Sequence, residues 1–195
     1  MVSLAALDRA LLSPDAVDQV TGTTGMTPHK RVTVMDDHRD LLPNLNCLGI
    51  WQVDDAGVYG KDGWIAVRQE LLRSPDVDQW DNLVVQSVIS YASADDARKF
   101  FDQSADRWPK CTNHHVNITV NGQPLPKWTS GQLTKTDSQL SIPVTRGTGD
   151  QTRSCQRALA VSANVIIDVQ TCTPPAPTAT QAATIAERIE SALPK

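Results

Sequence analysis

Alternation between apolar and polar residues predicts β-strands along much of the chain. The clearest case is 83–91, in which Leu83 and Ile89 share one face while Val84 and Val88 lie on the other. Similar patterns bounded by turn residues predict further extended segments at 32–35, 50–53, 63–72, 117–121, 132–135, 139–144, 154–162 and 165–172.

Helical periodicity occurs near both ends of the chain and once in its middle. Two short helices are predicted over 4–12 and 14–20, with Ser13 as the N-cap of the second. A longer helix is predicted over 93–108. A final helix follows the proline-rich segment 173–177, and its apolar stripe comprises Ala182, Ile185, Ala186, Ile189 and Leu193.

The order of these elements predicts an α+β fold. The polar segment 26–46 reads as a long surface loop, and the strands then follow one another with a single helix between them. Such an order favours an antiparallel β-sheet with helices packed on one face. The length of 195 residues favours one domain over 1–195.

Four cysteines, Cys47, Cys111, Cys155 and Cys172, indicate the compartment. A zinc site would need two closely spaced cysteine pairs, which the sequence lacks. Four unpaired core thiols are one interpretation. Two intradomain disulfides are the favoured one, and they imply an oxidising compartment.

The last two predicted strands suggest how the cysteines pair, although sequence alone permits three connectivities. If Ala163 and Asn164 form a two-residue hairpin loop, Cys155 lies directly opposite Cys172. Only the asparagine tolerates a positive φ comfortably, so a slightly longer loop stays open. By elimination, Cys47 would pair with Cys111.

Composition and charge argue against two classes of partner. The net charge is −4 and the basic residues are scattered, so nucleic-acid binding is not expected. No apolar run approaches the roughly 20 residues that cross a bilayer. Because Asp8 and Arg9 interrupt the first apolar residues, a secretory signal is not expected either, and any membrane anchor would belong to a segment outside this chain.

Searches for catalytic and metal-binding motifs predict no catalytic residue, cofactor or metal ligand. The hydrolase, metalloprotease, phosphate-loop and EF-hand patterns are missing. Asp76, Asp78 and Asp81 are spaced as calcium ligands could be, but Trp80 occupies an intervening ligand position. The adjacent histidines at 114–115 would point to opposite faces of a strand.

Tryptophan is unusually frequent and supplies the candidate binding residues. Trp64 and Trp108 are expected in the core. Trp51, Trp80 and Trp128 lie among polar loop residues and could wall a ligand site, since exposed indole offers flat apolar area with a donor. The alternative is that these three cap the edges of the sheet.

Four stretches together resemble one protein family. They are LLSPDAVDQVTGTTGM from Leu11, GWIAVRQELL from Gly63, SYASADDARKFFDQSADRWPKC ending at Cys111, and CQRALAVSANVIIDVQTC from Cys155. These stretches are similar to the PknH-like extracellular domain of mycobacteria, and the resemblance covers nearly the whole chain. Such domains occur in transmembrane Ser/Thr protein kinases and as stand-alone envelope lipoproteins.

The resemblance implies a disulfide-linked sensor domain on the extracellular face of the membrane. Its partner would be an unknown small molecule, cell-wall component or protein that binds in a cleft and regulates signalling. The domain itself would not be an enzyme, because the kinase motifs are absent from this sequence. The alternative is an envelope lipoprotein of the same fold that binds a cell-wall component or a protein.

Overall fold

A computed structural model describes residues 1–194. Within them, nine strands form one antiparallel sheet, and a separate hairpin pairs β5 (Thr119–Val120) with β6 (Gln123–Pro124). The order across the sheet is β1 (Thr27–Pro28), β2 (Trp64–Ser74), β3 (Asn82–Tyr91), β11 (Val165–Thr173), β10 (Arg153–Ser162), β9 (Gln139–Arg146), β7 (Trp128–Ser130) and β4 (His115–Val116), with β8 (Thr134–Lys135) also paired to β9. The α+β fold with an antiparallel sheet is therefore confirmed.

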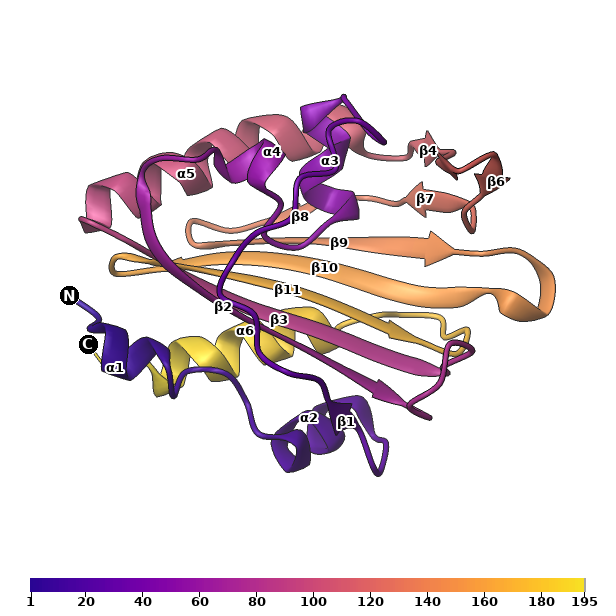
Figure 1. The fold of residues 1–195 in the computed structure, drawn as a ribbon, viewed down its shortest axis with the longest axis horizontal. Coiled ribbons are helices and arrows are strands. Elements are labelled where there is room, and N and C mark those ends of the chain that lie inside the picture. Colours follow the sequence, from indigo (N-terminus) through magenta and orange to yellow (C-terminus); the bar gives the residue numbers. More distant parts are fainter. Residues whose placement is uncertain (195) are drawn as a thin grey trace.

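Helices cover both faces of the sheet, whereas the sequence predicted one covered face (Figure 1). The first face carries α3 (Leu45–Trp51), α4 (Ala56–Tyr59), α5 (Ala94–Arg107) and the 3-10 helix η1 (Trp108–Cys111). The second carries α1 (Leu4–Leu7), α2 (Pro14–Thr21) and α6 (Gln181–Ala192). No helix of residues 1–194 is both long and apolar enough to cross a membrane.

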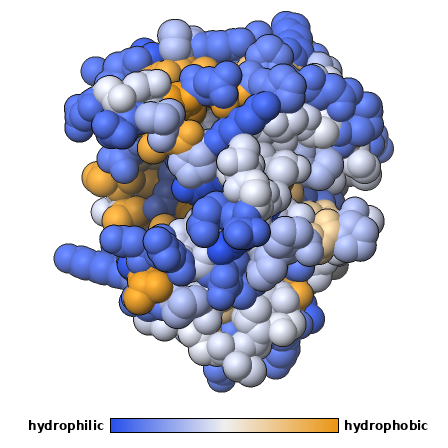
Figure 2. Space-filling view, turned by 90° about the vertical axis from the view of Figure 1, so that its right-hand side faces the viewer, coloured by the Kyte–Doolittle hydropathy of each residue, from blue (hydrophilic) through white to orange (hydrophobic). Residues whose placement is uncertain are grey.

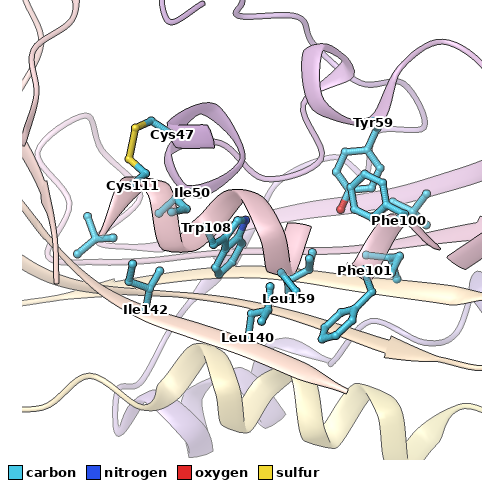
Figure 3. Packing of buried hydrophobic residues seen from close by; sticks show 14 of the residues in the cluster. Cys47, Ile50, Tyr59, Phe100, Phe101, Trp108, Cys111, Leu140, Ile142 and Leu159 are labelled. Atoms are coloured by element: carbon cyan, nitrogen blue, oxygen red, sulfur yellow. A yellow bond between two sulfur atoms is a disulfide. The ribbon is translucent and has the colours of Figure 1, made fainter. Parts of the chain in front are cut away.

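The central strands explain why two covering layers are needed. Every residue of β11 is buried, and β3 sends Val84 and Val88 to one core but Ile89 and Tyr91 to the other. A strand that is apolar on both faces must be covered on both. Figure 3 shows the larger core, where α5 places Phe101 over the sheet and η1 contributes Trp108.

Several short segments differ from their predicted form. The segment 50–53, expected to be extended, begins within α3, whose N-cap Asn44 accepts a hydrogen bond from the Asn46 backbone. A brief apolar run fits either a helix or a strand, and here packing against the first face of the sheet selects the helix. The expected strand at 32–35 is only an isolated bridge from Val32 to Gln69.

Other predicted elements are present but shorter. The helix predicted over 4–12 ends at Leu7. The strands expected at 117–121 and 132–135 shrink to the two-residue β5 and β8. In contrast, the 3-10 helix η2 (Gly149–Gln151), between β9 and β10, had no counterpart in the sequence prediction.

The two disulfides and the final hairpin are confirmed. Cys155 faces Cys172 in the register of β10 and β11, and Cys47 is bonded to Cys111. Ala163, rather than Asn164, adopts the positive φ, at 50°. Asn164 instead uses its side chain: Oδ1 accepts from the Val2 backbone N–H at 2.7 Å, and Nδ2 donates to the Tyr91 carbonyl at 2.9 Å.

Removing either disulfide should lower the free energy of unfolding by an amount set mainly by the length of the loop it closes. The separations are 64 residues for Cys47–Cys111 and 17 for Cys155–Cys172. We expect losses of about 4 kcal/mol for C47A/C111A and about 3 kcal/mol for C155A/C172A. Urea unfolding of both double variants would measure this, and losses below about 1 kcal/mol for both would contradict it.

Candidate functional site

The three candidate tryptophans lie in different places. Trp128 belongs to β7 and is only 3% exposed, so it is a core residue, which does not favour a role in an open site. Trp51 ends α3, and its ring meets His38 edge to face at 5.7 Å. Trp80, in the loop between β2 and β3, lies beneath the Arg146 guanidinium at 5.3 Å. The structure does not assemble one aromatic-walled site from them. Of the two expected core tryptophans, Trp108 is buried and Trp64 partly so.

A groove of about 520 Å³ lies beside the N-terminus of α6. It forms because α6 packs mainly over β10 and β11 and leaves the same face of β9 largely uncovered. The segment from Ala176 to Thr180, which leads into α6, forms another wall of the groove. The sheet side chains that line the groove alternate along two strands, as strand geometry requires: Ser141, Pro143 and Thr145 from β9, and Ser154 and Gln156 from β10.

The groove is lined by hydroxyl, amide and small apolar groups, and none of its lining side chains is charged. Gln156 is only 6% exposed, and its Oε1 accepts from the Ala183 backbone N–H at 3.0 Å. Its Nε2 donates to no other described residue. Thr180, whose side chain does not cap α6, also lines the groove. Such a lining suits a polar, uncharged ligand with hydrogen-bonding groups.

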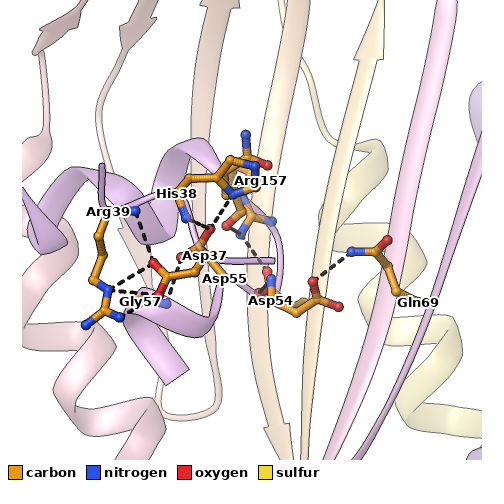
Figure 4. A network of polar contacts seen from close by, with 10 residues as sticks. Asp37, His38, Arg39, Asp54, Asp55, Gly57, Gln69 and Arg157 are labelled. Atoms are coloured by element: carbon orange, nitrogen blue, oxygen red, sulfur yellow. Dashed lines mark hydrogen bonds and ion pairs between the residues drawn. The ribbon is translucent and has the colours of Figure 1, made fainter. Parts of the chain in front are cut away.

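A buried ionic pair on the opposite face connects the sheet to the first helical layer. Arg157 projects from β10 (Figure 4) and is fully buried. Its Nη2 donates to Asp168 Oδ1 at 2.6 Å. The same guanidinium donates to the carbonyls of Gly49, Ile50 and Gln52, at the end of α3. These carbonyls have no partner within the helix, so the arginine satisfies them and complements the helix dipole.

Asp168 and Asp54 extend this network. Asp168 Oδ2 accepts from the Asp54 backbone N–H and from the Tyr59 hydroxyl, both at 2.9 Å. The Asp54 carboxylate accepts from Gln69 at 2.7 Å and from Ser87 at 2.6 Å. Burial raises the pKa of Asp54 to about 7, and nearby Asp168 also raises it, although the hydrogen bond from Ser87 opposes the shift.

The next residue, Asp55, fixes the segment that precedes α3. Its Oδ2 lies 2.6 Å from Nδ1 of His38 and accepts from the His38 backbone N–H, while Oδ1 accepts from the Gly57 backbone N–H (Figure 4). The long loop expected at 26–46 is therefore anchored near its middle.

The sequence prediction missed this network because Asp54 and Asp55 resembled ordinary turn residues. A signal was available in the final hairpin. Arg157 and Asp168 fall on the same face of the predicted pair of strands, at diagonal positions, among apolar residues. Opposite charges placed so in a buried sheet indicate an ion pair.

Comparison with known proteins decides the family. A profile of the PknH-like extracellular domain matches residues 2–191. The chain belongs to this family. It is 31% identical over 166 residues, which is 85% of its length, to the serine/threonine-protein kinases PknH of Mycobacterium bovis and Mycobacterium tuberculosis. The chain spans about a quarter of these relatives, 27% and 26% respectively.

A solved structure of the family has the same fold. The crystal structure of the extracellular domain of PknH from Mycobacterium tuberculosis matches with a TM-score of 0.86 and 28% sequence identity. The match covers 97% of this chain and 95% of that one. The expected resemblance to the PknH-like family is confirmed over nearly the whole chain.

The buried Asp54 carboxyl should make stability depend on pH. Its folded pKa of about 7 exceeds the ordinary value of 3.8, so the folded state holds the proton more tightly than the unfolded state. This contribution is fully present below about pH 4 and is lost as pH rises towards 7, with a slope of at most about 1.4 kcal/mol per pH unit.

Urea unfolding between pH 4 and pH 8 would measure this contribution. We expect D54N to lack it, whereas D102N, which alters an exposed carboxyl on α5, should follow the unmodified protein. The same pH dependence in D54N and in the unmodified protein would show that Asp54 does not titrate in this range.

Proposed function

We propose that this domain is the extracellular ligand-binding sensor of a transmembrane Ser/Thr protein kinase. The observation that carries the proposal is the likeness, over 97% of the chain, to the extracellular domain of PknH, together with relatives that are serine/threonine-protein kinases. Two disulfides fit an extracellular location, where the environment keeps them oxidised. A membrane anchor would come from a segment outside this chain.

The ligand would bind in the groove beside α6. A partner that accepts a hydrogen bond from Nε2 of Gln156 would satisfy a donor that now lacks a protein partner. The remaining lining favours a small molecule or cell-wall component rich in hydroxyl groups over a strongly charged one. Binding of a protein partner would instead need a larger surface than this groove offers.

The position of α6 suggests how ligand binding in the groove would affect the part of the protein next to the membrane. The helix begins at the groove and runs to the end of the molecule where both ends of the described chain lie (Figure 1). Val2 and Leu193 belong to the same core as α6. A ligand that binds two orientations of this helix with unequal affinity would shift the equilibrium between them, which is the requirement for signalling.

Filling the groove should abolish ligand binding without unfolding the domain. Thr145 is exposed on β9 and faces the groove, so T145W places a large side chain there. T119W changes an exposed strand threonine elsewhere and is the matched control. A mycobacterial envelope extract should raise the melting temperature of the unmodified protein and T119W but not T145W. A ligand at a hundred times its dissociation constant adds about 2.7 kcal/mol of stability.

Two results would count against binding in the groove: an equal shift in T145W, or no shift from any envelope fraction.

The kinase assignment has a separate test. The chain would replace the extracellular domain of Mycobacterium tuberculosis PknH, and autophosphorylation would be measured with and without the active fraction. A response lost in T145W supports the sensor function, and a lipid-attachment cysteine in place of a kinase domain in the parent protein would favour the lipoprotein alternative.

A further inference from the structure

Two arginines face each other where β9 and β10 meet their connecting loop. Arg146 and Arg153 are register partners, one position beyond the pair Thr145 and Ser154 that lines the groove. Because side chains alternate along a strand, the arginines point away from the face that carries the groove. Like charges opposite each other in a ladder are unfavourable, so a compensating interaction is expected.

Trp80 supplies part of that compensation. The guanidinium carbons of Arg146 and Arg153 lie 5.3 and 5.9 Å from the centre of its ring. Both distances fall within the range of cation–π attraction. The loop between β2 and β3, which carries Trp80, is thereby held against the start of β10.

The two arginines differ in their hydrogen bonds. Arg153 donates to the Trp80 carbonyl and to Asp81, each at 3.1 Å, and to the Thr152 carbonyl at 3.0 Å. The Arg146 guanidinium makes no hydrogen bond and no ion pair to any of residues 1–194. A guanidinium has five N–H donors, so those of Arg146 are available to a ligand. Burial, and then the charge of Arg153, lower the pKa of Arg146, which marks a cation without a partner.

The space beside Arg146 fits a small group. A pocket of about 110 Å³ is bounded by Arg146, Arg153, Trp80, Pro126, Gln151, Gln79 and Asp78. One water molecule needs roughly 10–15 Å³ of such space, so the pocket has room for a small oxyanion. Of the nearby carboxylates, Asp81 pairs with Arg153, and Asp78 is fully exposed with Arg73 at 3.7 Å. Neither forms an ion pair with Arg146.

The end of the molecule that carries these loops is largely hydrophilic. Figure 2 views it from the right-hand side of Figure 1 and shows hydrophobic residues mainly towards the left and upper margins. The two arginines are partly exposed, in a protein whose net charge is −4. A fixed pair of guanidinium groups in such a setting is a local attraction for anions.

We propose that Arg146, supported by Arg153 and Trp80, binds a phosphate group carried by an envelope molecule. The guanidinium fork matches phosphate oxygens and would gain the ion pair it lacks. The indole ring offers a flat surface to the sugar or glycerol that bears the phosphate. The source of the phosphate is either a soluble sugar phosphate or the headgroup of a phospholipid. This site is separate from the groove beside α6.

Titration of the whole domain with inorganic phosphate at low ionic strength tests the site. Binding is followed by calorimetry and by tryptophan fluorescence, to which Trp80 contributes directly. We expect R146Q to weaken phosphate binding at least about tenfold, as loss of a charge-assisted hydrogen bond predicts. R9Q removes the same charge from an exposed residue next to α1 and should change affinity less than about twofold. W80F should lose most of the fluorescence response.

The same titration distinguishes two roles for Arg146. Either it binds phosphate, or it only holds in place the loop that carries Trp80. If R146Q lowers the melting temperature but leaves phosphate affinity equal to that of R9Q, the proposal is wrong. It also fails if phosphate does not bind the unmodified protein at millimolar concentration. T145W should bind phosphate normally, so failure of the groove proposal and failure of this one are distinguishable.

Two further ligands identify the source of the phosphate. Glucose 6-phosphate and vesicles containing phosphatidylinositol are compared, with zwitterionic phosphatidylcholine vesicles as the control without net charge. Tighter binding of the sugar phosphate, lost in R146Q, supports a soluble glycan. Binding to phosphatidylinositol vesicles alone, also lost in R146Q, supports a lipid headgroup. Binding of either ligand that R146Q retains would overturn the assignment.

Discussion

One buried arginine determines how the first helical layer meets the sheet. Arg157 lies on a central strand, pairs with Asp168 on the next strand, and donates to three carbonyls at the end of α3. A buried ion pair of this kind adds little net stability over an apolar pair, but removing one partner leaves an uncompensated charge and costs about 3–5 kcal/mol. Within this pair, Arg157 also satisfies the final carbonyls of α3 and so ties that helix to the sheet. The disulfide from Cys47 in α3 to Cys111 in η1 holds the same layer covalently.

Both proposed binding sites lie at one end of the sheet, where β9 meets β10. The buried charges and both cores hold β3, β11 and β10 in place, and the hairpin turn at the other end is tied to the N-terminal segment through Asn164. The long loops gather where β9 ends and β10 begins. Two successive register pairs of β9 and β10 point to opposite faces of the sheet there. Thr145 and Ser154 line the groove beside α6, and Arg146 and Arg153 line the pocket proposed to bind phosphate. A rigid scaffold that presents loops at one end is a common arrangement for binding sites.

The elements that the sequence predicted well are those whose signals are local. The strand 83–91, the helix 93–108 and the final hairpin each carry their periodicity and end signals within a few residues. The pairing of Cys155 with Cys172 follows from that hairpin alone, and the pairing of Cys47 with Cys111 follows by elimination.

Features that depend on distant segments were not predictable in the same way. The strand order places β11 and β10 in the centre of the sheet, which requires cover on both faces, and the sequence pattern did not reveal that order. The groove depends on how far α6 reaches across the sheet. The three candidate tryptophans looked alike as loop residues, yet strand pairing buries Trp128, a short helix carries Trp51, and two arginines surround Trp80.

Ligands are proposed to bind at the end of the sheet where β9 meets β10, while the central strands of the sheet stay in place. Amide hydrogen exchange with and without a mycobacterial envelope extract tests it most directly. The account predicts slower exchange at 146–156 and 176–183, with unchanged exchange in the centres of β3 and β11. Protection confined to the turn at 163–164 or to α5, or no protection anywhere, would contradict it.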